Sequence, residues 1–299
     1  MSLRVAIAGT TGLIGHGIAG ALAREGHRVV TIGRHEDAQV RFDLANAAAG
    51  PLVGLRGCDA LVHAAGVTDE DLAEPARAAA KTKGARALLA AARDAGIRRF
   101  AYVSSAHVYG PLEGMIDESR PPDPRSDYAR AHMAVESLFR ETAEANGAAL
   151  LIARPCAAYG LPPSLERFAR WSLIPFDFPR QALAGRIVLK SHGAQRRNFV
   201  PVEGLGNLVG WWLGLGRSGV TVANAPGRDE MSVYDFALLC ATIAGAITGR
   251  RCEVVRPQEP QPAAPALEYR TRVAGHLPGP SLEQHVERLV HALSQEHAQ

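Results

Sequence analysis

The segment Gly9-Thr10-Thr11-Gly12-Leu13-Ile14-Gly15 follows a short apolar run and opens a helical pattern that continues to Arg24. Glycines at its first, fourth and seventh positions let backbone N–H groups at a helix N-terminus approach a phosphate without an intervening side chain. A strand, a glycine-rich turn and a helix in this order are typical of a dinucleotide-binding site. Taken by its spacing alone, the segment is also compatible with a purely structural turn.

Outward from this turn, short apolar runs alternate with longer helical patterns through the first half of the chain. The predicted strands span residues 3–8, 28–32, 60–63, 99–104 and 149–153, and the predicted helices span residues 13–24, 71–95 and 127–145. Strands that alternate with helices in this way are typical of a parallel sheet covered on both faces. The sequence therefore predicts an α/β fold with a doubly wound parallel sheet.

The pattern changes after Pro155. Prolines at 162, 163, 175 and 179 interrupt the chain, and a proline-rich stretch at 257–265 precedes a last predicted helix at 281–294. We therefore predict a dinucleotide-binding domain over residues 1–155 and, mainly, a smaller substrate-binding lobe over residues 156–299. A segment at about 195–223 is expected to return to the first domain.

Composition limits the class of protein. The chain has 299 residues, 47% hydrophobic and 21% charged, and can bury its own core. Its formal net charge is 33 − 30 = +3 with both signs mixed along the sequence, which argues against nucleic acid or a membrane surface as partner. The four cysteines form no CxxC pair, so no metal site is expected. No apolar stretch reaches the roughly 20 residues of a membrane span, and we expect a cytoplasmic protein.

The end of the second predicted strand bears on the choice of cofactor. An acidic residue there would accept hydrogen bonds from a ribose 2′-OH and repel a 2′-phosphate. This chain has Gly33-Arg34 instead, followed by His35. Because the Arg34 guanidinium can pair with a 2′-phosphate, the sequence favours NADP, with NAD as the alternative.

Further motifs follow in a characteristic order. They are Asp43-Leu44, His63-Ala64-Ala65-Gly66, Ser104-Ser105-Ala106-His107-Val108-Tyr109-Gly110, Tyr128 with Glu136 eight residues later, Arg154-Pro155, Tyr159-Gly160 and Arg197-Asn198-Phe199-Val200-Pro201-Val202. Together they resemble the extended short-chain dehydrogenase/reductase family of NAD(P)-dependent nucleotide-sugar epimerases and dehydratases across essentially the whole chain. The resemblance implies a Rossmann fold with a smaller C-terminal lobe.

The resemblance also implies roles for individual residues. It places the pyrophosphate at Gly9, Gly12 and Gly15, the adenine at Asp43 and Leu44, the rest of the cofactor along Ala64, Ala65 and Pro155, and the diphosphate of a nucleotide-sugar at Arg197. Ser105 falls on the family's catalytic serine or threonine, and Tyr128 falls on its catalytic tyrosine. Chemistry agrees, because hydride transfer at a carbinol needs a proton acceptor at the same oxygen.

The chain departs from the family pattern at the site itself. His132 stands where the motif Tyr-x-x-x-Lys has its lysine, and a histidine with an ordinary pKa near 6.5 is mostly neutral at pH 7. Lys81 replaces an asparagine on the preceding helix, and we expect its ammonium to lie within about 6 Å of the Tyr128 hydroxyl and supply the missing charge. The alternative is a solvated helix lysine. His132 would keep the nicotinamide ribose contact.

Three other positions bear on the substrate. Ala157 and Asn198 replace a family asparagine and aspartate, which indicates an altered substrate site. His107 either points into the pocket as a proton donor or fills space above the sheet. Ser105-Ala106-His107 lacks the Thr-Asp-Glu signature of the 4,6-dehydratases, which argues against dehydration.

The leading interpretation is an epimerase or ketoreductase that acts on a nucleotide-sugar or similar hydroxylated substrate. The resemblance implies a homodimer, whose interface the helices at 71–95 and 127–145 would form; the alternative is that these helices only cover the sheet. The segment from Ser105 to Gly110 favours epimerase, whereas NADP favours reductase. The alternative interpretation is an NADP(H)-binding sensor or scaffold that has lost catalysis together with the lysine. Cofactor turnover distinguishes the two.

Overall fold

The structure is a computed structural model that describes residues 2–47, 50–257, 266–273, 277 and 279–296. Its helices are α1 (Leu13–Arg24), α2 (Asp69–Leu72), α3 (Pro75–Asp94), α4 (Asp127–Ala145), α5 (Ile174–Leu183), α6 (Val202–Gly214), α7 (Val233–Thr248) and α8 (Leu282–Glu296), with 3-10 turns η1 (Leu44–Asn46), η2 (Val53–Leu55) and η3 (Ala106–Tyr109). Its strands are β1 (Arg4–Ala8), β2 (Arg28–Gly33), β3 (Val40–Arg41), β4 (Ala60–His63), β5 (Arg99–Val103), β6 (Gly114–Ile116), β7 (Ala149–Pro155), β8 (Ala157–Tyr159), β9 (Arg186–Val188), β10 (Arg196–Pro201), β11 (Val220–Ala225), β12 (Asp229–Ser232), β13 (Glu253–Val255) and β14 (Leu267–Tyr269).

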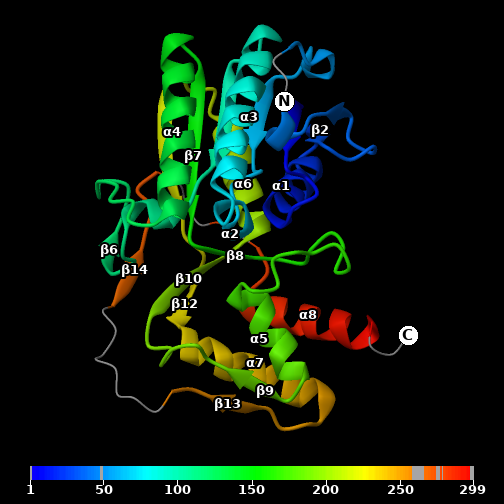
Figure 1. Cartoon of the computed structure of the whole chain (residues 1–299), viewed down its shortest axis with the longest axis vertical. Coiled ribbons are helices and arrows are strands. Elements are labelled where there is room, and N and C mark those ends of the chain that lie inside the picture. Colours follow the sequence, from blue (N-terminus) through cyan, green and yellow to red (C-terminus); the bar gives the residue numbers. More distant parts are fainter. Residues whose placement is uncertain (1, 48–49, 258–265, 274–276, 278, 297–299) are drawn as a thin grey trace.

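A seven-stranded parallel sheet forms the larger part of the molecule (Figure 1). Its strand order is β11-β7-β5-β4-β1-β2-β3, and every neighbouring pair is parallel. One face packs against α3 and α4, and the other packs against α1 and α6. The central strands are almost wholly apolar because both faces are covered. The predicted α/β fold with a doubly wound parallel sheet is confirmed.

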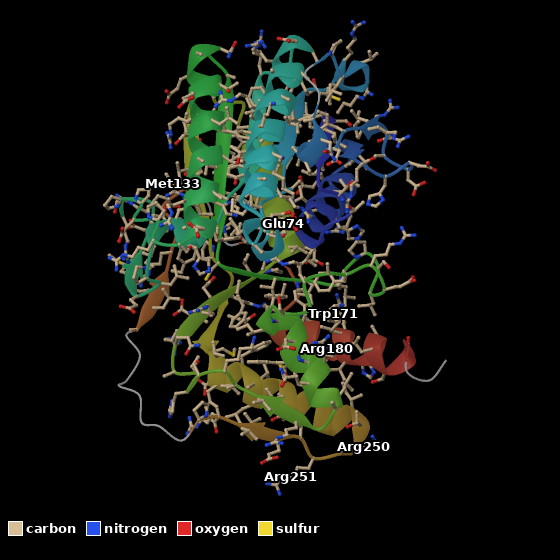
Figure 2. The ribbon with its side chains drawn as sticks, viewed as in Figure 1. Glu74, Met133, Trp171, Arg180, Arg250 and Arg251 are labelled. Atoms are coloured by element: carbon tan, nitrogen blue, oxygen red, sulfur yellow. The ribbon has the colours of Figure 1, made fainter. Side chains whose placement is uncertain are left out.

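The predicted helix at 71–95 is wrong in one respect, because the chain breaks it in two. Helix α2 ends at Leu72 and α3 begins at Pro75. Proline lacks an N–H and disfavours helical geometry in the residue before it, and Glu74 is extended at the lower end of α3 (Figure 2). Pro75 therefore starts a helix instead of continuing one.

The chain after Pro155 alternates between the sheet and a smaller lobe. Helix α6 covers one face of the sheet and β11 forms its edge, whereas β10 pairs with β8 and β12 in a separate three-stranded sheet. Helices α5, α7 and α8 pack beside this small sheet below the large one (Figure 1). In the segment between β8 and α5, the Trp171 ring lies 5.6 Å from the Arg180 guanidinium (Figure 2). Of the predicted proline-rich stretch, residues 258–265 lie outside the described residues.

Candidate active site

The glycine turn joins β1 to α1 in a geometry that side chains would obstruct. Gly9 has φ of +95°, and a Cβ there would lie 2.9 Å from the backbone nitrogen of Ala65. A Cβ on Gly15 would lie 2.2 Å from the Gly9 carbonyl oxygen, so α1 starts directly against the end of the strand. Helix α1 starts after Gly12 without a side-chain cap, so no cap side chain accepts from its first-turn N–H groups, which are the groups that bind an anion at a helix N-terminus.

Asp43 and Leu44 follow β3, at the same carboxyl edge of the large sheet as the glycine turn. The Asp43 carboxylate accepts hydrogen bonds from the Asn46 side chain and the Ala45 backbone N–H, each at 3.0 Å. These bonds, with the charge of Arg34, hold the pKa of Asp43 below its usual range. A Cβ on Gly84 would lie 2.1 Å from the Leu44 carbonyl oxygen, so α3 packs tightly against η1. Arg34 itself is exposed.

Three aromatic rings meet at the first turn of α4. Ser126 caps this helix by accepting a hydrogen bond from the Ala129 N–H at 3.1 Å. The Tyr128 ring lies edge-on to the ring of His132, with centroids 4.6 Å apart, and its centroid is 5.9 Å from that of His107. His132 lies one helical turn beyond Tyr128, which explains their contact. His107 is exposed and comes from η3, after β5.

The His132 imidazole is buried and has one hydrogen-bond partner. Its Nδ1 lies 2.7 Å from the hydroxyl of Tyr102 on β5, whereas its Nε2 is buried without a partner among the described residues. Burial, together with the nearby charges of His107 and Arg170, lowers the pKa of His132 to about 4. His132 is therefore neutral at pH 7, as expected from the sequence.

The neighbours of His132 determine which of its nitrogens carries the proton. Burial, with the charges of Glu136 and Tyr128 nearby, raises the pKa of Tyr102 well above its usual value, so Tyr102 keeps its proton. A phenol without another acceptor donates that proton to Nδ1, and the neutral ring then carries its own proton on Nε2. His132 thus presents an N–H donor beside Gly66, where a Cβ would lie 3.7 Å from Nε2. The ring of His63 stacks on that of Tyr102, with centroids 5.6 Å apart.

Ser105 lies directly after β5 and is buried. Its Oγ accepts a hydrogen bond from the His107 N–H at 3.3 Å, so it caps η3. This bond uses the hydroxyl as an acceptor and leaves its proton available to a ligand oxygen. Both interpretations of Ser105, a turn cap and a hydroxyl donor, are therefore compatible with one geometry.

Lys81 is held by a buried carboxylate that sequence reasoning missed. Its Nζ lies 2.5 Å from Oδ2 of Asp71, and the Arg77 guanidinium lies 2.9 Å from Oδ1 of the same group. Asp71 is 1% exposed and also accepts hydrogen bonds from the backbone and hydroxyl of Thr68, both at 2.8 Å. Lys81 is thus not a freely solvated helix lysine. Its charge remains close enough to His63 to help lower that pKa to about 4, after the effects of burial and of His132.

Glu136, which the sequence motif included without a role, forms a buried ion pair beneath the site. Its carboxylate accepts two hydrogen bonds from the Arg154 guanidinium, at 2.6 and 3.0 Å, and one from the Ser104 hydroxyl at 2.5 Å. Burial acts to lower the pKa of Arg154, but Glu136 outweighs it and raises that pKa. The Arg154 guanidinium also lies 4.8 Å from the centre of the Tyr109 ring. This network ties α4 to β5 and β7.

The departures at Asn198 and Ala157 lie in the small sheet, where Asn198 has a structural role. The Asn198 amide donates to the Gly227 carbonyl at 3.0 Å and accepts from the Gly227 N–H at 2.8 Å. An amide carries both a donor and an acceptor, which aspartate does not. Next to it, Arg197 is half-buried, and its guanidinium donates to the Arg196 carbonyl at 2.9 Å.

Most predicted site residues lie along the carboxyl edge of the large sheet, whereas Lys81 lies on α3 and Arg197 lies in the small sheet. The glycine turn carries Gly9, Thr11, Gly12, Leu13, Ile14 and Gly15, and the turns after β2, β3 and β4 carry Arg34, Asp43, Leu44, Ala64 and Ala65. The ring cluster contains Tyr128, His132 and His107, with Ser105 beside it. Pro155 ends β7 and Arg197 lies on β10. Sequence reasoning missed Tyr102 on β5, Asp71 in α2 and the half-buried Arg170 between β8 and α5, because none of them belongs to a recognisable motif.

No group of three or more histidine, cysteine, aspartate or glutamate side chains in the described part of the chain is arranged to hold a metal ion. Of the helices in the same part, none combines the length and the apolar character needed to cross a bilayer.

The sequence was compared with known families and proteins. The NAD-dependent epimerase/dehydratase family model matches residues 5–220. A dTDP-D-glucose 4,6-dehydratase from Mus musculus is 31% identical over 164 residues, covering 52% of this chain and 42% of the dehydratase. A 3-diazoavenalumate denitrifying reductase from Streptomyces sp. is 31% identical over 221 residues, covering 67% of this chain and 69% of the reductase. The match to the dehydratase thus spans less than half of that protein.

The fold was compared with solved structures. The structure of MoeE5 in complex with UDP-glucuronic acid and NAD has a TM-score of 0.78 and 20% sequence identity, and the match covers 98% of this chain and 99% of MoeE5. A match at this identity shows a shared fold over nearly the whole length.

Proposed function

Because the chain belongs to the NAD-dependent epimerase/dehydratase family, we propose that it is an NAD(P)-dependent epimerase or ketoreductase acting on a nucleotide-sugar or similar hydroxylated substrate. One observation carries the proposal: Tyr128 packs against His132 and His107, and Ser105 lies at the backbone of His107. A phenol, a hydroxyl and an imidazole N–H are the groups that a carbinol oxygen and a nicotinamide ribose require.

The residues at the carboxyl edge of the sheet fit a dinucleotide. The glycine turn forms a cradle that a Cβ would fill, and the buried His132 Nε2 lacks a partner. A bound nicotinamide would supply the hydride acceptor or donor. In the proposed arrangement α1 holds the pyrophosphate, Asp43 and Leu44 hold the adenine, and His132 donates to the ribose. Arg34 pairs with a 2′-phosphate, which makes NADP the preferred form.

Tyr128 is the proposed acid and base. It takes the proton of the substrate hydroxyl when the carbon that bears it is oxidised, and returns that proton on reduction, while Ser105 donates a hydrogen bond to the same oxygen. A phenol with an ordinary pKa near 10 is a weak base at pH 7 unless a cation stabilises its anion. His132 is neutral at that pH, so we propose Lys81 as this cation, with Asp71 fixing its position.

The substrate is proposed to lie between the sheet and the lobe formed mainly by residues 156–299. Arg197 is half-buried on β10 and is proposed to bind the diphosphate of a nucleotide-sugar. The binding of UDP-glucuronic acid by MoeE5, which shares the fold, supports this ligand class. The match to a reductase over two thirds of this chain supports the ketoreductase form of the proposal. A homodimer through α3 and α4 is proposed as the assembly.

The test is cofactor turnover by the purified protein with a panel of nucleotide-sugars. We expect Tyr128→Phe and Lys81→Met to abolish turnover of an accepted substrate, because one removes the base and the other its cation. We expect His132→Lys to preserve or raise turnover. Arg217→Ala, an exposed change outside the site, is the matched control and should leave the rate unchanged.

Two outcomes would contradict parts of this proposal. Full activity of Lys81→Met would remove Lys81 from the chemistry, and Arg170, whose charge already reaches His132, would be the next cation to replace. NADPH binding without turnover of any substrate in the panel would support the sensor or scaffold interpretation instead.

A further inference from the structure

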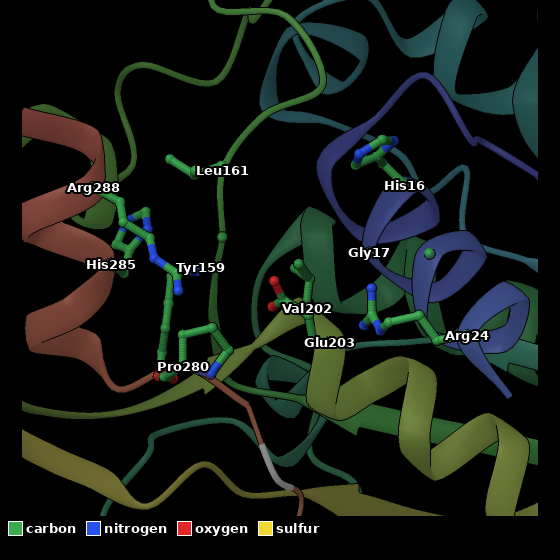
Figure 3. Close-up of a pocket in the computed structure, with 12 residues that line it drawn as sticks. His16, Gly17, Arg24, Tyr159, Leu161, Val202, Glu203, Pro280, His285 and Arg288 are labelled. Atoms are coloured by element: carbon green, nitrogen blue, oxygen red, sulfur yellow. The ribbon is translucent and has the colours of Figure 1, made fainter. Parts of the chain in front are cut away.

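A pocket lies beside α1, away from the ring cluster. Its walls come from α1, the chain after β8, the first turn of α6 and the start of α8, and it holds about 610 Å³ of space open to solvent (Figure 3). His16, one residue beyond the glycine turn, lines one end, and Arg24, at the last residue of α1, lines another. The pocket thus lies between the helices that cover one face of the large sheet, α1 and α6, and helix α8 of the smaller lobe.

Two arginines enter this pocket from opposite walls. Arg24 extends from α1 and Arg288 extends from α8, with the carboxylate of Glu203 between them (Figure 3). Neither guanidinium forms a hydrogen bond or an ion pair with any residue in the described ranges, although Glu203 is an acid on the same pocket wall. The formal charges of Arg24, Arg288 and Glu203 therefore sum to +1 in this pocket.

A second pocket-like hollow beside α4 shows the contrast. There Arg154 is paired with Glu136, and Arg120 donates to the carbonyl oxygens of Glu113 and Pro111. Those two arginines already have partners, whereas Arg140, the third arginine of that hollow, has no hydrogen bond or ion pair with a described residue. The α1 pocket differs in that both of its arginines lack such partners.

Two side chains of the pocket, His285 and Glu203, each have a buried hydrogen-bond acceptor that receives no hydrogen bond from the described residues. His285 is 2% exposed, its Nε2 lies 3.0 Å from the Pro175 carbonyl, and its Nδ1 is buried with no partner in the described chain. Burial lowers the pKa of His285 to about 4, so the ring is neutral, donates through Nε2 and keeps an accepting lone pair on Nδ1. Oε2 of Glu203 is likewise buried without a donor. Such acceptors match hydroxyl groups.

Two glycines of α1, Gly17 and Gly20, line this pocket. A Cβ on Gly17 would lie 2.4 Å from the Val202 side chain, so this glycine lets α6 approach α1. A Cβ on Gly20 would lie 3.4 Å from Nη1 of Arg24, which means that the arginine folds back over a bare stretch of helix. Glycine within a helix costs about 1 kcal/mol relative to alanine, a cost that a binding site would explain.

We propose that this pocket binds a small phosphorylated and hydroxylated molecule of the sugar-phosphate class. Arg24 and Arg288 bind the phosphate, which carries about 1.5 to 2 negative charges at pH 7. Glu203 and His285 accept hydrogen bonds from the hydroxyls after small side-chain shifts. The site is separate from the proposed cofactor groove and does not depend on the proposed function.

The test is calorimetric titration of the full chain with glucose 1-phosphate, inorganic phosphate and glucose, in the presence of saturating NADPH. We expect glucose 1-phosphate to bind at least fivefold more tightly than inorganic phosphate, and glucose to give no heat. Arg24→Ala and Arg288→Ala should each weaken glucose 1-phosphate at least tenfold, whereas Arg217→Ala should leave it unchanged. Gly20→Leu should fill the pocket and abolish binding without lowering the melting temperature, because leucine favours the helix.

The contrary results are equally specific. A loss of binding in Arg197→Ala with none in Arg24→Ala would place the ligand in the proposed substrate site and overturn the inference. Displacement of glucose 1-phosphate by NADPH would assign the pocket to the cofactor groove. Equal affinities for glucose 1-phosphate and inorganic phosphate would show that the sugar hydroxyls make no contact, and would overturn the assignment to the sugar-phosphate class. The absence of binding heat with both compounds would refute the site.

Discussion

The hydrogen bond between Tyr102 and His132 allows a sharp test of the site. Tyr102→Phe removes one hydroxyl and keeps the ring that stacks with His63 and Phe139. The phenol is 1% exposed and lies 2.7 Å from Nδ1 of His132, which is 4% exposed. The change therefore leaves a buried acceptor without its donor, and removes the group that keeps the His132 proton on Nε2.

The expected magnitudes follow from that geometry. An unsatisfied buried acceptor costs about 1 to 3 kcal/mol, and each kcal/mol lowers the melting temperature by about 2 to 4 °C in a domain of this size. The hydrogen bond itself is worth about 0.5 to 1.5 kcal/mol of preference for the Nε2–H tautomer. If Nε2–H donates to the cofactor, losing that preference lowers the fraction of the Nε2–H tautomer from about 0.7–0.9 to about 0.5, which weakens NADPH binding by about 1.4- to 1.9-fold.

Thermal unfolding and fluorescence titration with NADPH measure the two effects separately. Tyr269→Phe is the matched control. The buried hydroxyl of Tyr269 donates to the Arg154 carbonyl over 2.6 Å and is not part of the ring cluster. The control should lose comparable stability and keep its NADPH affinity. Nitrogen NMR of labelled histidine, with His132→Gln for assignment, reports the tautomer directly. Unchanged NADPH affinity in Tyr102→Phe, or a proton found on Nδ1 in the unmodified protein, would refute the reasoning.

Three further predictions concern cofactor, substrate and pH. NADPH should bind more tightly than NADH by about 1.5 to 3 kcal/mol, and Arg34→Asp should erase or invert that preference in fluorescence titrations; equal affinities in the unmodified protein would rule out the NADP preference. Arg197→Ala should weaken nucleotide-sugar binding in calorimetry and leave NADPH binding intact; if both fall together, the residue is structural. Burial lowers the pKa of His63, His132 and His285 to about 4. Because the unfolded chain takes up these protons near pH 6.5, the free energy of unfolding should fall as pH drops from about 6.5 to 4, by about 2 kcal/mol per histidine at pH 5; equal urea midpoints at pH 7 and pH 5 would contradict this.

Local pattern was enough to predict much of the first half of the chain. Helices α1 and α4 have the predicted bounds, and β4 spans the predicted residues. The spacing of apolar residues indicates whether a helix or strand is covered on one face or on both. The glycine turn is equally local, because the glycines that its backbone geometry requires lie within seven consecutive residues. Pro75 carried an equally local signal, and reading it would have separated α2 from α3.

The sequence by itself thus determined the α/β class, the glycine turn and the residue types available for chemistry. The tertiary structure alone decided their partners: Asp71 for Lys81, Tyr102 for His132, and Arg154 with Ser104 for Glu136. Two of these contacts join residues 30 and 32 positions apart, across β5 and α4. They depend on the order of strands in the sheet and on the rotation of each helix above it. Both are set by packing of the whole core, and no local stretch of sequence contains that information.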